Sequence, residues 1–545
     1  MQKLACRFFV LAVSFVSLVY AVQPAKAQND RTDSAKVPAD IRKIFDKPAY
    51  KNAIWGLRVL DLESGRELID LQPHHQFFIG SVRKVFTIGE LLNEVGPQHR
   101  YDTPVYRVGD VDKEGVLHGD LVLVASGDLT MGGRTKPDGT IAFTNYDHNE
   151  SDSLGNSELT APNPLAGYIA LARQVAAAKI KKITGDVIID DRLFQPFFFR
   201  GEFNVRPIFV NDDVVDLTIN PTRAGERASV EYRPHSEALE VDNDLVTSRA
   251  KSDYTLKLDP DPPLPTCIGR PDCTVAIAGN LPVDFAPPLT NKFPLIQTFR
   301  IVQPSNYART VFIEQLKAAG VKVEAPLVAE NPTSLLPDKD DYTRRTRVAE
   351  LKGMPYSEDA KLVLKVSYNI GADTSLLLFG LTKGVDNLPA ALKAEKRDLA
   401  CNYGIDDSEY FFVDGSGGGP TTATNGAVTH MLRDMSTRRV FPQFFSALPN
   451  LGIDGSLASF TDFESDPTLA GAKGSVHAKP GSYVAGSASG LLVKGQAYGG
   501  YITAKSGRRL VYQLVVNEVP VADVNGLIQI FQDQATISAM LWRDN

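Results

Sequence analysis

The 545-residue chain lacks several features that would assign it to a common class of protein. Its formal net charge is −7, which argues against nucleic acid or an anionic lipid surface as a partner. It has no His-Glu-any-any-His motif of zinc peptidases and no glycine-any-serine-any-glycine motif of α/β-hydrolases. The eight histidines are scattered apart from the pair His74-His75. We therefore expect no metal and no organic cofactor.

Long apolar runs are scarce as well. The run from Phe8 to Val22 is about 15 residues, short of the roughly 20 needed to span a bilayer. It follows Lys3 and Arg7 and precedes the small-residue site Ala25-Lys26-Ala27, so residues 1–27 are predicted to be a secretory signal peptide. We expect secretion across the inner membrane into the periplasm or extracytoplasmic cell envelope, without a transmembrane anchor.

Cysteine is rare, with four in the chain. Cys267 and Cys273 lie six residues apart, and a disulfide closing this turn is the favoured interpretation in an oxidising compartment. A zinc site would need further cysteine or histidine ligands nearby, which the sequence does not supply. Cys401 is left over, and we expect it to be a buried free thiol.

Ser81-Val82-Arg83-Lys84 is the most informative segment that is present, because it puts a hydroxyl and an amine three residues apart on one helical face. An amine in a poorly solvated site can give up its proton and then draw the proton from the serine, which makes the serine a nucleophile toward a carbonyl. Alone, the motif occurs by chance in most chains of this length, often as a helix cap or a solvated pair.

Two further motifs follow in order, Ser367-Tyr368-Asn369 and Lys479-Pro480-Gly481. Serine-any-any-lysine, serine-any-asparagine and lysine-any-glycine together form the signature of penicillin-recognising serine enzymes. The first two motifs are too far apart for a compact β-lactamase. Lys505-Ser506-Gly507 matches the third motif as well, but it lies between two strand patterns and is predicted to be a solvated hairpin turn.

With these motifs in place, the chain resembles the peptidase S13 family, the D-alanyl-D-alanine carboxypeptidases also called class C low-molecular-mass penicillin-binding proteins. Further matching segments are Gly119 to Val122, Ser126 to Asp128, Gly185 to Asp191, Asn211 to Asp216, Asp414 to Gly417, Asp454 to Leu457 and Ser506 to Asn517. The resemblance implies an α+β fold: a penicillin-binding, serine β-lactamase-like transpeptidase domain, with an antiparallel sheet flanked by helices, interrupted by one or two inserted β-rich domains.

The resemblance also implies roles for the first two motifs. Ser81 would be the acylated nucleophile and Lys84 its base, Ser367 would relay a proton to the leaving group, and Asn369 would hold the substrate amide. Peptide cleavage needs such a path, because the attacking group must lose a proton and the departing amine must gain one. Asp414-Gly415-Ser416-Gly417 is predicted to be a structured loop bordering the cleft.

The third motif would form the inner edge of the sheet. Lys479 would favour an anionic substrate, Gly481 would let the backbone approach the acyl group, and the backbone N–H groups of Ser81 and Ser482 would hold the oxyanion. The family has threonine or serine at the middle position, where this chain has Pro480, which offers neither hydroxyl nor N–H. We expect altered carboxylate recognition here, although Ser482 could supply a hydroxyl in place of the missing one.

The periodicity of the chain suggests how its parts are arranged. Apolar residues recur at helical spacing from Val85 to Val95, Trp55 to Asp61 alternates like a strand, and a final amphipathic helix follows residue 524. Between residues 100 and 300 the sequence pattern changes to short apolar strands separated by Gly, Pro and Asp turns. We expect a catalytic domain formed by residues 28–100 together with residues 300–545, and an inserted β-rich region over residues 101–299.

The sequence therefore predicts a serine D-alanyl-D-alanine carboxypeptidase or endopeptidase that acts on peptidoglycan stem peptides and is inhibited by β-lactams. Two alternatives stay open at this stage. One is a related esterase, amidase or β-lactamase with shifted specificity, suggested by Pro480. The other is a catalytically weak cell-wall binding protein that keeps the fold.

Overall fold

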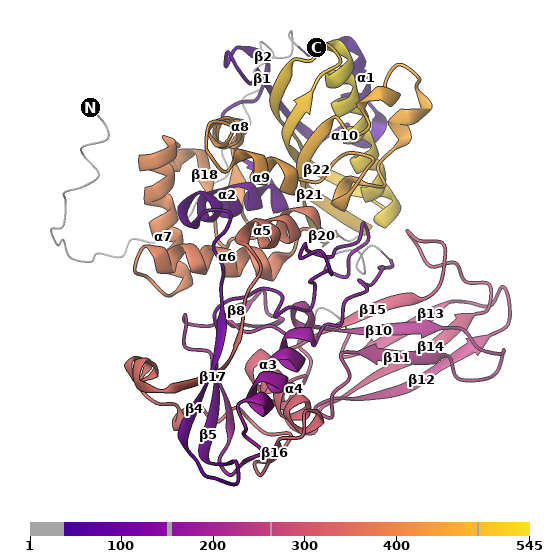
Figure 1. The fold of residues 1–545 in the computed structure, drawn as a ribbon. Coiled ribbons are helices and arrows are strands. Elements are labelled where there is room, and N and C mark those ends of the chain that lie inside the picture. The colour runs from indigo at the N-terminus through magenta and orange to yellow at the C-terminus, as the bar shows by residue number, and fades with distance from the viewer. Residues whose placement is uncertain (1–36, 150–154, 262–263, 488–489) are drawn as a thin grey trace, which may run out of the picture.

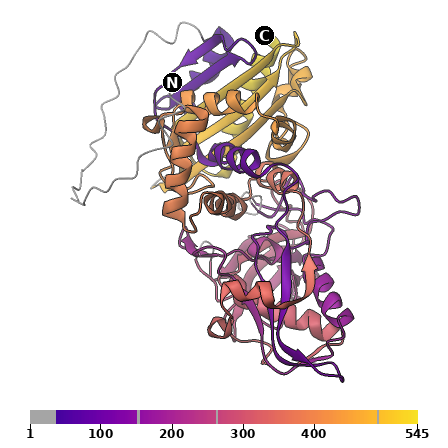
Figure 2. The ribbon, with the colours of Figure 1, turned by 60° about the vertical axis from the view of Figure 1, so that its left-hand side comes forward.

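The computed structural model describes residues 37–149, 155–261, 264–487 and 490–545. The predicted signal peptide, 1–27, lies outside these residues. Figures 1 and 2 show two packed lobes: an α+β lobe built from both ends of the chain, and a second lobe that the middle of the chain forms. Among the helices of the described residues, none has the length and apolarity required to cross a bilayer.

The α+β lobe is organised around a five-stranded antiparallel sheet in the order β2-β1-β22-β21-β20. Its strands are β1 (Ile54–Asp61), β2 (Glu67–Leu71), β20 (Val476–Ser487), β21 (Gly490–Thr503) and β22 (Arg509–Val521). The two hairpins predicted at the ends of the sequence are thus joined through the pairing of β1 with β22. The edge strand β20 carries Lys479 and Pro480.

Helices cover both faces of this sheet, because its buried residues alternate between two cores. On one face, α10 (Val524–Asp544) and α1 (Ala39–Phe45) pack on a core that includes Tyr512 and Leu514. The other face, with Val511 and Val515, belongs to the core of the remaining helices. These are α2 (Lys84–Val95), α5 (Tyr356–Lys365), α6 (Asn369–Thr382), α7 (Leu388–Asp398), α8 (Asn425–Met435) and α9 (Phe441–Ala447). The predicted fold class is confirmed.

Helix α2 follows Ser81 as the periodicity predicts. Val85, Ile88, Leu91 and Leu92 are fully buried, and Gly96, with φ of +85°, ends the helix. Just before α2, β3 (Phe77–Phe78) pairs with β19 (Thr422–Ala423), which pairs with β18 (Tyr410–Phe411). The turn with Ser81 is therefore held between a small sheet and a buried helix.

The inserted region has two kinds of layer. The first is a mixed sheet in the order β16-β6-β5-β4-β17, with β7 paired to β5, covered by helices α3 and α4. Its elements are β4 (Thr103–Val111), β5 (Val116–Val124), α3 (Ala166–Ala177), β6 (Lys182–Ile183), β7 (Val187–Asp190), α4 (Pro304–Ala318), β16 (Lys322–Val323) and β17 (Thr346–Leu351).

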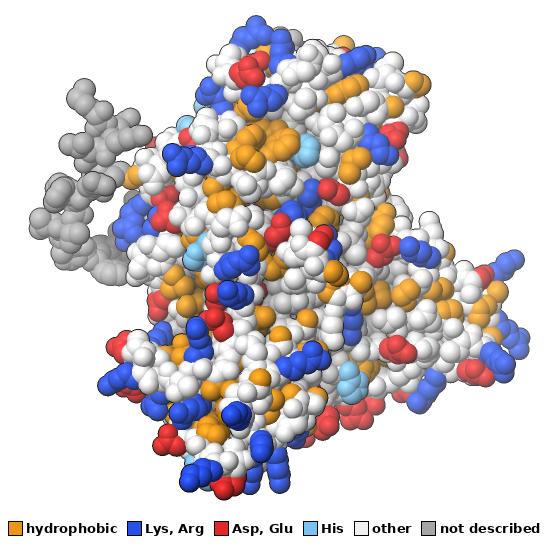
Figure 3. Space-filling model, in the orientation of Figure 1, with side chains coloured by type: hydrophobic (Ala, Val, Ile, Leu, Met, Phe, Trp, Pro, Cys, Tyr) orange, Lys and Arg blue, Asp and Glu red, His pale blue; other side chains and the backbone are white. Residues whose placement is uncertain are grey.

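The second layer projects sideways as a β-rich extension (Figure 1). It contains the sheets β11-β10-β15 and β12-β14-β13, and a short hairpin, β8-β9, leads into it. The strands are β8 (Phe197–Phe199), β9 (Phe203–Val205), β10 (Val214–Asn220), β11 (Ser229–Arg233), β12 (Glu240–Ser248), β13 (Thr255–Asp259), β14 (Thr274–Pro282) and β15 (Leu295–Arg300). Charged side chains of both signs are interspersed over the face seen in Figure 3.

The predicted return to the catalytic domain at residue 300 does not agree with the strand pairing. Helix α4 packs on α3 and β7, and β17 pairs with β4, so residues 304–351 belong with the inserted sheet. The helical periodicity after residue 300 is real, but periodicity shows only that one face is buried and not which sheet buries it. We place the return between β17 and α5.

The cysteines agree with one prediction and correct another. Cys267 and Cys273 form a disulfide with a Cα–Cα distance of 5.3 Å. Cys401 is half-buried and disulfide-bonded, so the expected buried free thiol is wrong.

Glu90 on α2 generates a stability prediction. It is fully buried and lies against the carboxylate of Glu395. Burial, reinforced by the carboxylates of Glu395 and Asp398, raises the pKa of Glu90 well above its ordinary value. A raised folded-state pKa means that stability falls as the pH climbs above about 4.3, the value in an unfolded chain. Glu90→Gln removes this loss.

We expect the unfolding free energy of Glu90→Gln, relative to wild type, to rise between pH 4 and pH 8. The gain is about 1.4 kcal/mol for each unit by which folding raises the pKa. Urea unfolding at several pH values measures it, and pH-independent costs of the amide cancel in the comparison. Glu94→Gln, exposed on the same helix, should show no such gain. A flat difference for Glu90→Gln would contradict the prediction.

Candidate active site

The three motifs meet at one place. Ser81 lies in a single 3₁₀ turn, Gly80–Arg83, and Lys84 begins α2. Lys84 Nζ lies 2.6 Å from Ser81 Oγ, 2.7 Å from Asn369 Oδ1 and 3.3 Å from Ser367 Oγ. Its fourth contact is the carbonyl oxygen of Ser416, at 3.0 Å. The Lys84 side chain is fully buried, so these oxygens, and not bulk water, fix its position.

Ser367 connects the two lysines. Lys479 Nζ donates a hydrogen bond of 2.9 Å to Ser367 Oγ and another of 2.7 Å to the carbonyl oxygen of Pro480. Ser367 lies between α5 and α6 with φ of +62°, a left-handed conformation that is uncommon for a residue with a side chain. Strain of this kind persists where the surrounding structure fixes the residue, and here it aims the hydroxyl between the two amines.

Two glycines bring the nucleophile turn against the edge strand. A Cβ atom on Gly481 would lie 2.1 Å from the carbonyl oxygen of Ile79 and 2.7 Å from the N atom of Ser81. A Cβ atom on Gly80, whose φ is +49°, would lie 2.5 Å from the N atom of Ser482. The backbone N atoms of Ser81 and Ser482 are thus on neighbouring segments that only glycine allows to approach so closely.

The hydroxyl of Ser482 already has a partner. Its Oγ lies 2.5 Å from Gln496 Oε1 on the adjacent strand, and the side-chain amide oxygen can only accept, so Ser482 donates this hydrogen bond. The proton of this hydroxyl is therefore not free for a substrate carboxylate. With Pro480 beside it, β20 offers fewer donors to a carboxylate than the family pattern implies.

The predicted loop around residues 414–417 is confirmed as a structured border of the site. Asp373 on α6 accepts hydrogen bonds from the backbone N–H of Gly415, at 2.7 Å, and from Ser416 Oγ, at 3.1 Å. Burial, reinforced by the carboxylate of Asp414, raises the pKa of Asp373 to about 7. Arg200, from the turn between β8 and β9, donates a hydrogen bond of 2.8 Å to Ser416 Oγ.

A cavity of about 350 Å³ opens over these groups. Its lining comprises Ser81, Asn145, Tyr146, Asp147, Arg200, Leu289, Val366, Ser367, Asn369, Gly417, Ser456, Ser459, Phe460, Lys479, Pro480, Ser482, Ile528, Phe531 and Gln532. Five of these residues come from the inserted region and three from α10. The cavity is therefore completed by segments that carry none of the three motifs.

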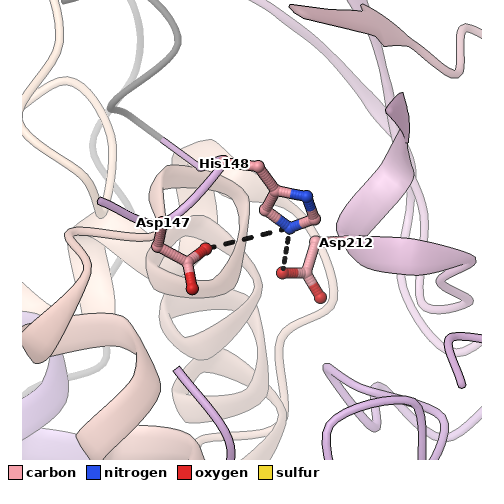
Figure 4. Close-up of side chains that lie close together, drawn as sticks. All are labelled: Asp147, His148 and Asp212. Carbon is pink, nitrogen blue, oxygen red and sulfur yellow. Dashed lines mark hydrogen bonds and ion pairs between the residues drawn. The ribbon is translucent and has the colours of Figure 1, made fainter. Parts of the chain in front are cut away.

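The wall from the inserted region is held by a buried ionic network. Arg134 donates to both carboxylate oxygens of Asp147, each at 2.8 Å, and pairs with Asp212 at 2.5 Å. His148 Nδ1 lies 2.6 Å from Asp216 Oδ1, and its Nε2 lies 2.7 Å from Arg134 Nη2. Asp147, His148 and Asp212 converge as metal ligands would (Figure 4), but the guanidinium of Arg134 contacts all three and supplies the cation.

The rejected match to the third motif lies elsewhere, and the histidine nearest to Lys479 in the sequence does not reach the site either. Lys505-Ser506-Gly507 is the exposed turn between β21 and β22, as predicted. His477 is on β20 with its ring 4.2 Å from the ring of Phe445, and burial lowers its pKa to about 4. Neither residue lines the cavity.

The structure brings together all seven residues that the sequence singled out, Ser81, Lys84, Ser367, Asn369, Lys479, Gly481 and Ser482. Sequence reasoning missed Arg200, Asp373 and the cavity residues of α10. No motif marks them, and they are placed by tertiary packing between segments that are far apart in the chain.

Comparison with known proteins places this geometry in a family. The D-Ala-D-Ala carboxypeptidase 3 (S13) family matches residues 37–533. The chain belongs to this family. It is 25% identical, over 91% of its length and 83% of the relative, to a D-alanyl-D-alanine carboxypeptidase of Actinomadura sp. (strain R39). It is thus a serine-type carboxypeptidase of the S13 family that acts on peptidoglycan.

Solved structures show the same fold. Penicillin binding protein 4 of Haemophilus influenzae superposes with a TM-score of 0.66 at 17% identity, covering 92% of this chain and 99% of that one. The same protein complexed with a β-lactam gives a TM-score of 0.63 at 16% identity, with the same coverage. The insertion into the penicillin-binding domain is therefore a shared feature of the fold.

Gly481→Ala tests the close approach of β20 to the nucleophile turn. The added Cβ would meet backbone atoms of Ile79 and Val82 at 2.1 and 2.5 Å, so the strand must shift away from Ser81. Losing an oxyanion donor costs about 100- to 1,000-fold in rate, and we expect a loss of that size in the second-order rate of acylation by benzylpenicillin. Gly486→Ala is the control, because its Cβ meets nothing within 4 Å on the same strand. Equal rates for the two variants would contradict this account.

Arg134→Ala tests whether the guanidinium is the built-in cation of the network. Removing one partner of a buried ionic cluster costs about 3–5 kcal/mol, so the variant should lose that much unfolding free energy. In the wild-type protein, neither EDTA nor added Zn²⁺ or Ca²⁺ should shift the melting temperature. A metal-dependent shift that disappears in Asp212→Asn would show that a metal site was overlooked.

Proposed function

We propose that the protein removes the terminal D-alanine of peptidoglycan stem peptides through an acyl-enzyme on Ser81. The observation that carries this proposal is the unbroken chain of contacts from Ser81 Oγ to Lys84 Nζ, to Ser367 Oγ and to Lys479 Nζ, with distances of 2.6, 3.3 and 2.9 Å. Such a chain can take a proton from the attacking group and return one to the departing amine.

In the first step, Lys84 as an uncharged amine accepts the proton of Ser81. Ser81 Oγ attacks the carbonyl carbon of the penultimate D-alanine, and the negative charge on the carbonyl oxygen is stabilised by the backbone N–H groups of Ser81 and Ser482. The side chain of Asn369, fixed by its 2.7 Å contact with Lys84, holds the substrate amide. Because the two backbone N–H groups are already in place, they need no rearrangement when charge develops on the carbonyl oxygen.

In the second step, the C–N bond breaks and the leaving amine takes the proton of Ser367 Oγ. Ser367 is reprotonated from Lys84, which carries the proton gained from Ser81, while Lys479 fixes the hydroxyl between them. Water then attacks the acyl-enzyme, with Lys84 again accepting the proton. The bond between the acyl carbon and Ser81 Oγ breaks, Lys84 returns the proton to Ser81 Oγ, and the shortened peptide leaves. Protons and charge balance over the cycle, so no cofactor is required by this mechanism.

We further propose that β-lactams acylate the same serine and that the protein works in the periplasm or extracytoplasmic envelope. The first proposal is supported by the β-lactam complex of the similar Haemophilus influenzae protein. The second is supported by the signal-like residues 1–27, by the disulfide of Cys267 and Cys273 and by the nature of the family's substrate.

Intact-mass spectrometry after incubation with benzylpenicillin tests the proposal. We expect one adduct in the wild-type protein, none in Ser81→Ala, and release of D-alanine from a D-alanyl-D-alanine peptide assayed in parallel. Ser367→Ala should be acylated more slowly, by about 100- to 10,000-fold, because the proton path is interrupted. An adduct that persists in Ser81→Ala would exclude the assigned nucleophile.

A further inference from the structure

The loop of residues 414–418 lies directly against the turn that carries the nucleophile. A Cβ atom on Gly417, whose φ is +99°, would lie 2.1 Å from the carbonyl oxygen of Gly80 and 3.0 Å from the N atom of Ser81. Three consecutive peptide groups of this loop are hydrogen-bonded at both ends. Each of them therefore connects one side chain near Ser81 to one carboxylate.

The carbonyl groups of these peptides accept hydrogen bonds from side chains of the nucleophile turn and α2. The pairs are Arg83 Nε with Asp414 at 3.0 Å, Thr87 Oγ1 with Gly415 at 2.7 Å, and Lys84 Nζ with Ser416 at 3.0 Å. The N–H groups of the same peptides donate to two carboxylates. The pairs are Gly415 with Asp373 at 2.7 Å, Ser416 with Asp414 at 3.1 Å, and Gly417 with Asp414 at 2.7 Å. Arg83 is thus connected to Asp373, and Lys84 to Asp414.

The third of these peptides transmits the effect of a charge to Lys84. The carbonyl of Ser416 and the N–H of Gly417 belong to one planar unit and point in opposite directions. When a carboxylate accepts from the N–H, it polarises the unit, and the carbonyl becomes a better acceptor. Hydrogen bonds in such a chain strengthen one another by about 10–30% per bond. A better acceptor favours the charged form of the Lys84 amine over the neutral form.

Asp414 supplies a permanent negative charge at the far end of this path. Its Oδ1 accepts from the backbone N–H groups of Ser416, Gly417 and Gly418. Burial alone would raise the pKa of Asp414, but Arg200 and the N–H groups of Gly418 and Gly417 outweigh it, and the pKa lies below its ordinary value. Asp414 is therefore ionised at every pH at which a buried amine loses its proton.

Other charged groups also face Lys84 and Asp414. They are Arg200 of the β8–β9 turn, Arg83 before α2, Asp373 of α6, Glu395 of α7, Lys479 of β20 and, across the cavity, Asp147. Arg200 lies 3.4 Å from Asp414 Oδ2 and opposes its charge. Arg83 is paired with Glu395 at 2.6 Å, so the path that starts at Asp373 ends at a cation that is already compensated.

We propose that Asp414 is a positioning residue for the reaction, which acts through the peptide of Ser416 and Gly417 to stabilise the ammonium group formed when Lys84 takes the proton of Ser81. Asp414 does not line the cavity, so it acts without touching the substrate. It makes Lys84 a stronger base, and at low pH it keeps a larger fraction of Lys84 charged and inactive. This inference rests on the proposed function, in which Lys84 is the base.

The test is the second-order rate of acylation by benzylpenicillin, measured from about pH 5 to about pH 10 in wild type and Asp414→Asn. The asparagine keeps an acceptor oxygen and loses the charge. The rate rises with pH as Lys84 of the free enzyme loses its proton. Loss of a negative charge at this separation lowers a pKa by about one unit, so the midpoint of the rise should move about one unit lower. The plateau at high pH should fall about three- to tenfold, because Lys84 is then a weaker base.

Three further variants separate this effect from damage to the loop. Thr87→Val removes the bond to Gly415 without a change of charge and should leave the midpoint in place. Asp373→Asn removes a carboxylate from the same loop, but one connected to Arg83, and should move the midpoint less than half as far. Arg200→Gln removes the charge that opposes Asp414 and should move the midpoint upward.

Two of these variants also serve as safeguards. Because the pKa of Asp373 is about 7, Asp414→Asn is measured in the Asp373→Asn background as well, where the same shift of about one unit is expected. Arg200 is partly exposed in a hairpin turn, so Arg200→Gln keeps the test available if Asp414→Asn does not fold. In that case an unmoved or lowered midpoint for Arg200→Gln overturns the role of Asp414.

The outcomes distinguish this role from the proposed function. A midpoint that Asp414→Asn leaves in place, or a wild-type rate without any rise in this range, overturns the role of Asp414 while labelling of Ser81 leaves the acyl-enzyme standing. Equal shifts for Asp414→Asn and Asp373→Asn also overturn it, because a general effect of charge would then suffice. Protein that takes no label, or Ser81→Ala protein that does, refutes the proposed function and the role of Asp414 with it.

Discussion

The position of the Lys84 side chain is the constraint on which the rest of the site depends. Its amine is fully buried and touches oxygens from four places: its own turn, the segment before α6, the first residue of α6 and the loop at Ser416. A buried amine is stable only when such partners are provided. Three features of the structure present these oxygens to the amine. Helix α2 packs closely against α6, Ser367 has a left-handed backbone, and the carboxylate of Asp373 holds the Ser416 loop.

The inserted region belongs to the active site as well as being an addition to the fold. The β8–β9 hairpin packs Phe197 against the core that contains Leu376 and Leu377 of α6, and it places Arg200 over the Ser416 loop. A second contact joins Asn145 Oδ1 to the backbone N–H of Gly455, which lies beside the cavity residue Ser456. The ionic network around Arg134 holds the segment that makes this contact, so Arg134 and Asp147 act on a cavity residue that is more than 300 positions away in the sequence.

The sequence predicted those features of the site that local chemistry encodes. Ser81 and Lys84 are one helical turn apart, and each of the other two motifs is recognisable from the spacing of its own residues. The order of the three motifs along the chain therefore indicated which groups meet. The helix after Ser81 and the terminal hairpins followed from periodicity. Periodicity could not tell which sheet α4 covers, and this is why the boundary at residue 300 failed. Arg200, Asp373 and Phe531 have no local signature, because only tertiary packing brings them to the cavity.

The alternation of side chains along β20 explains how chemistry and specificity can change separately. Successive residues of a strand point to opposite faces. Lys479 contacts Ser367, and Gly481 meets the nucleophile turn. Pro480 and Ser482 are paired with Tyr498 and Gln496 of β21, and Tyr498 packs in the core beneath α10. A change at residue 480 therefore alters the surface offered to the substrate without moving the lysine of the proton path. Proline also suits this position because β20 is the edge strand, where a missing N–H leaves no neighbouring strand without its partner.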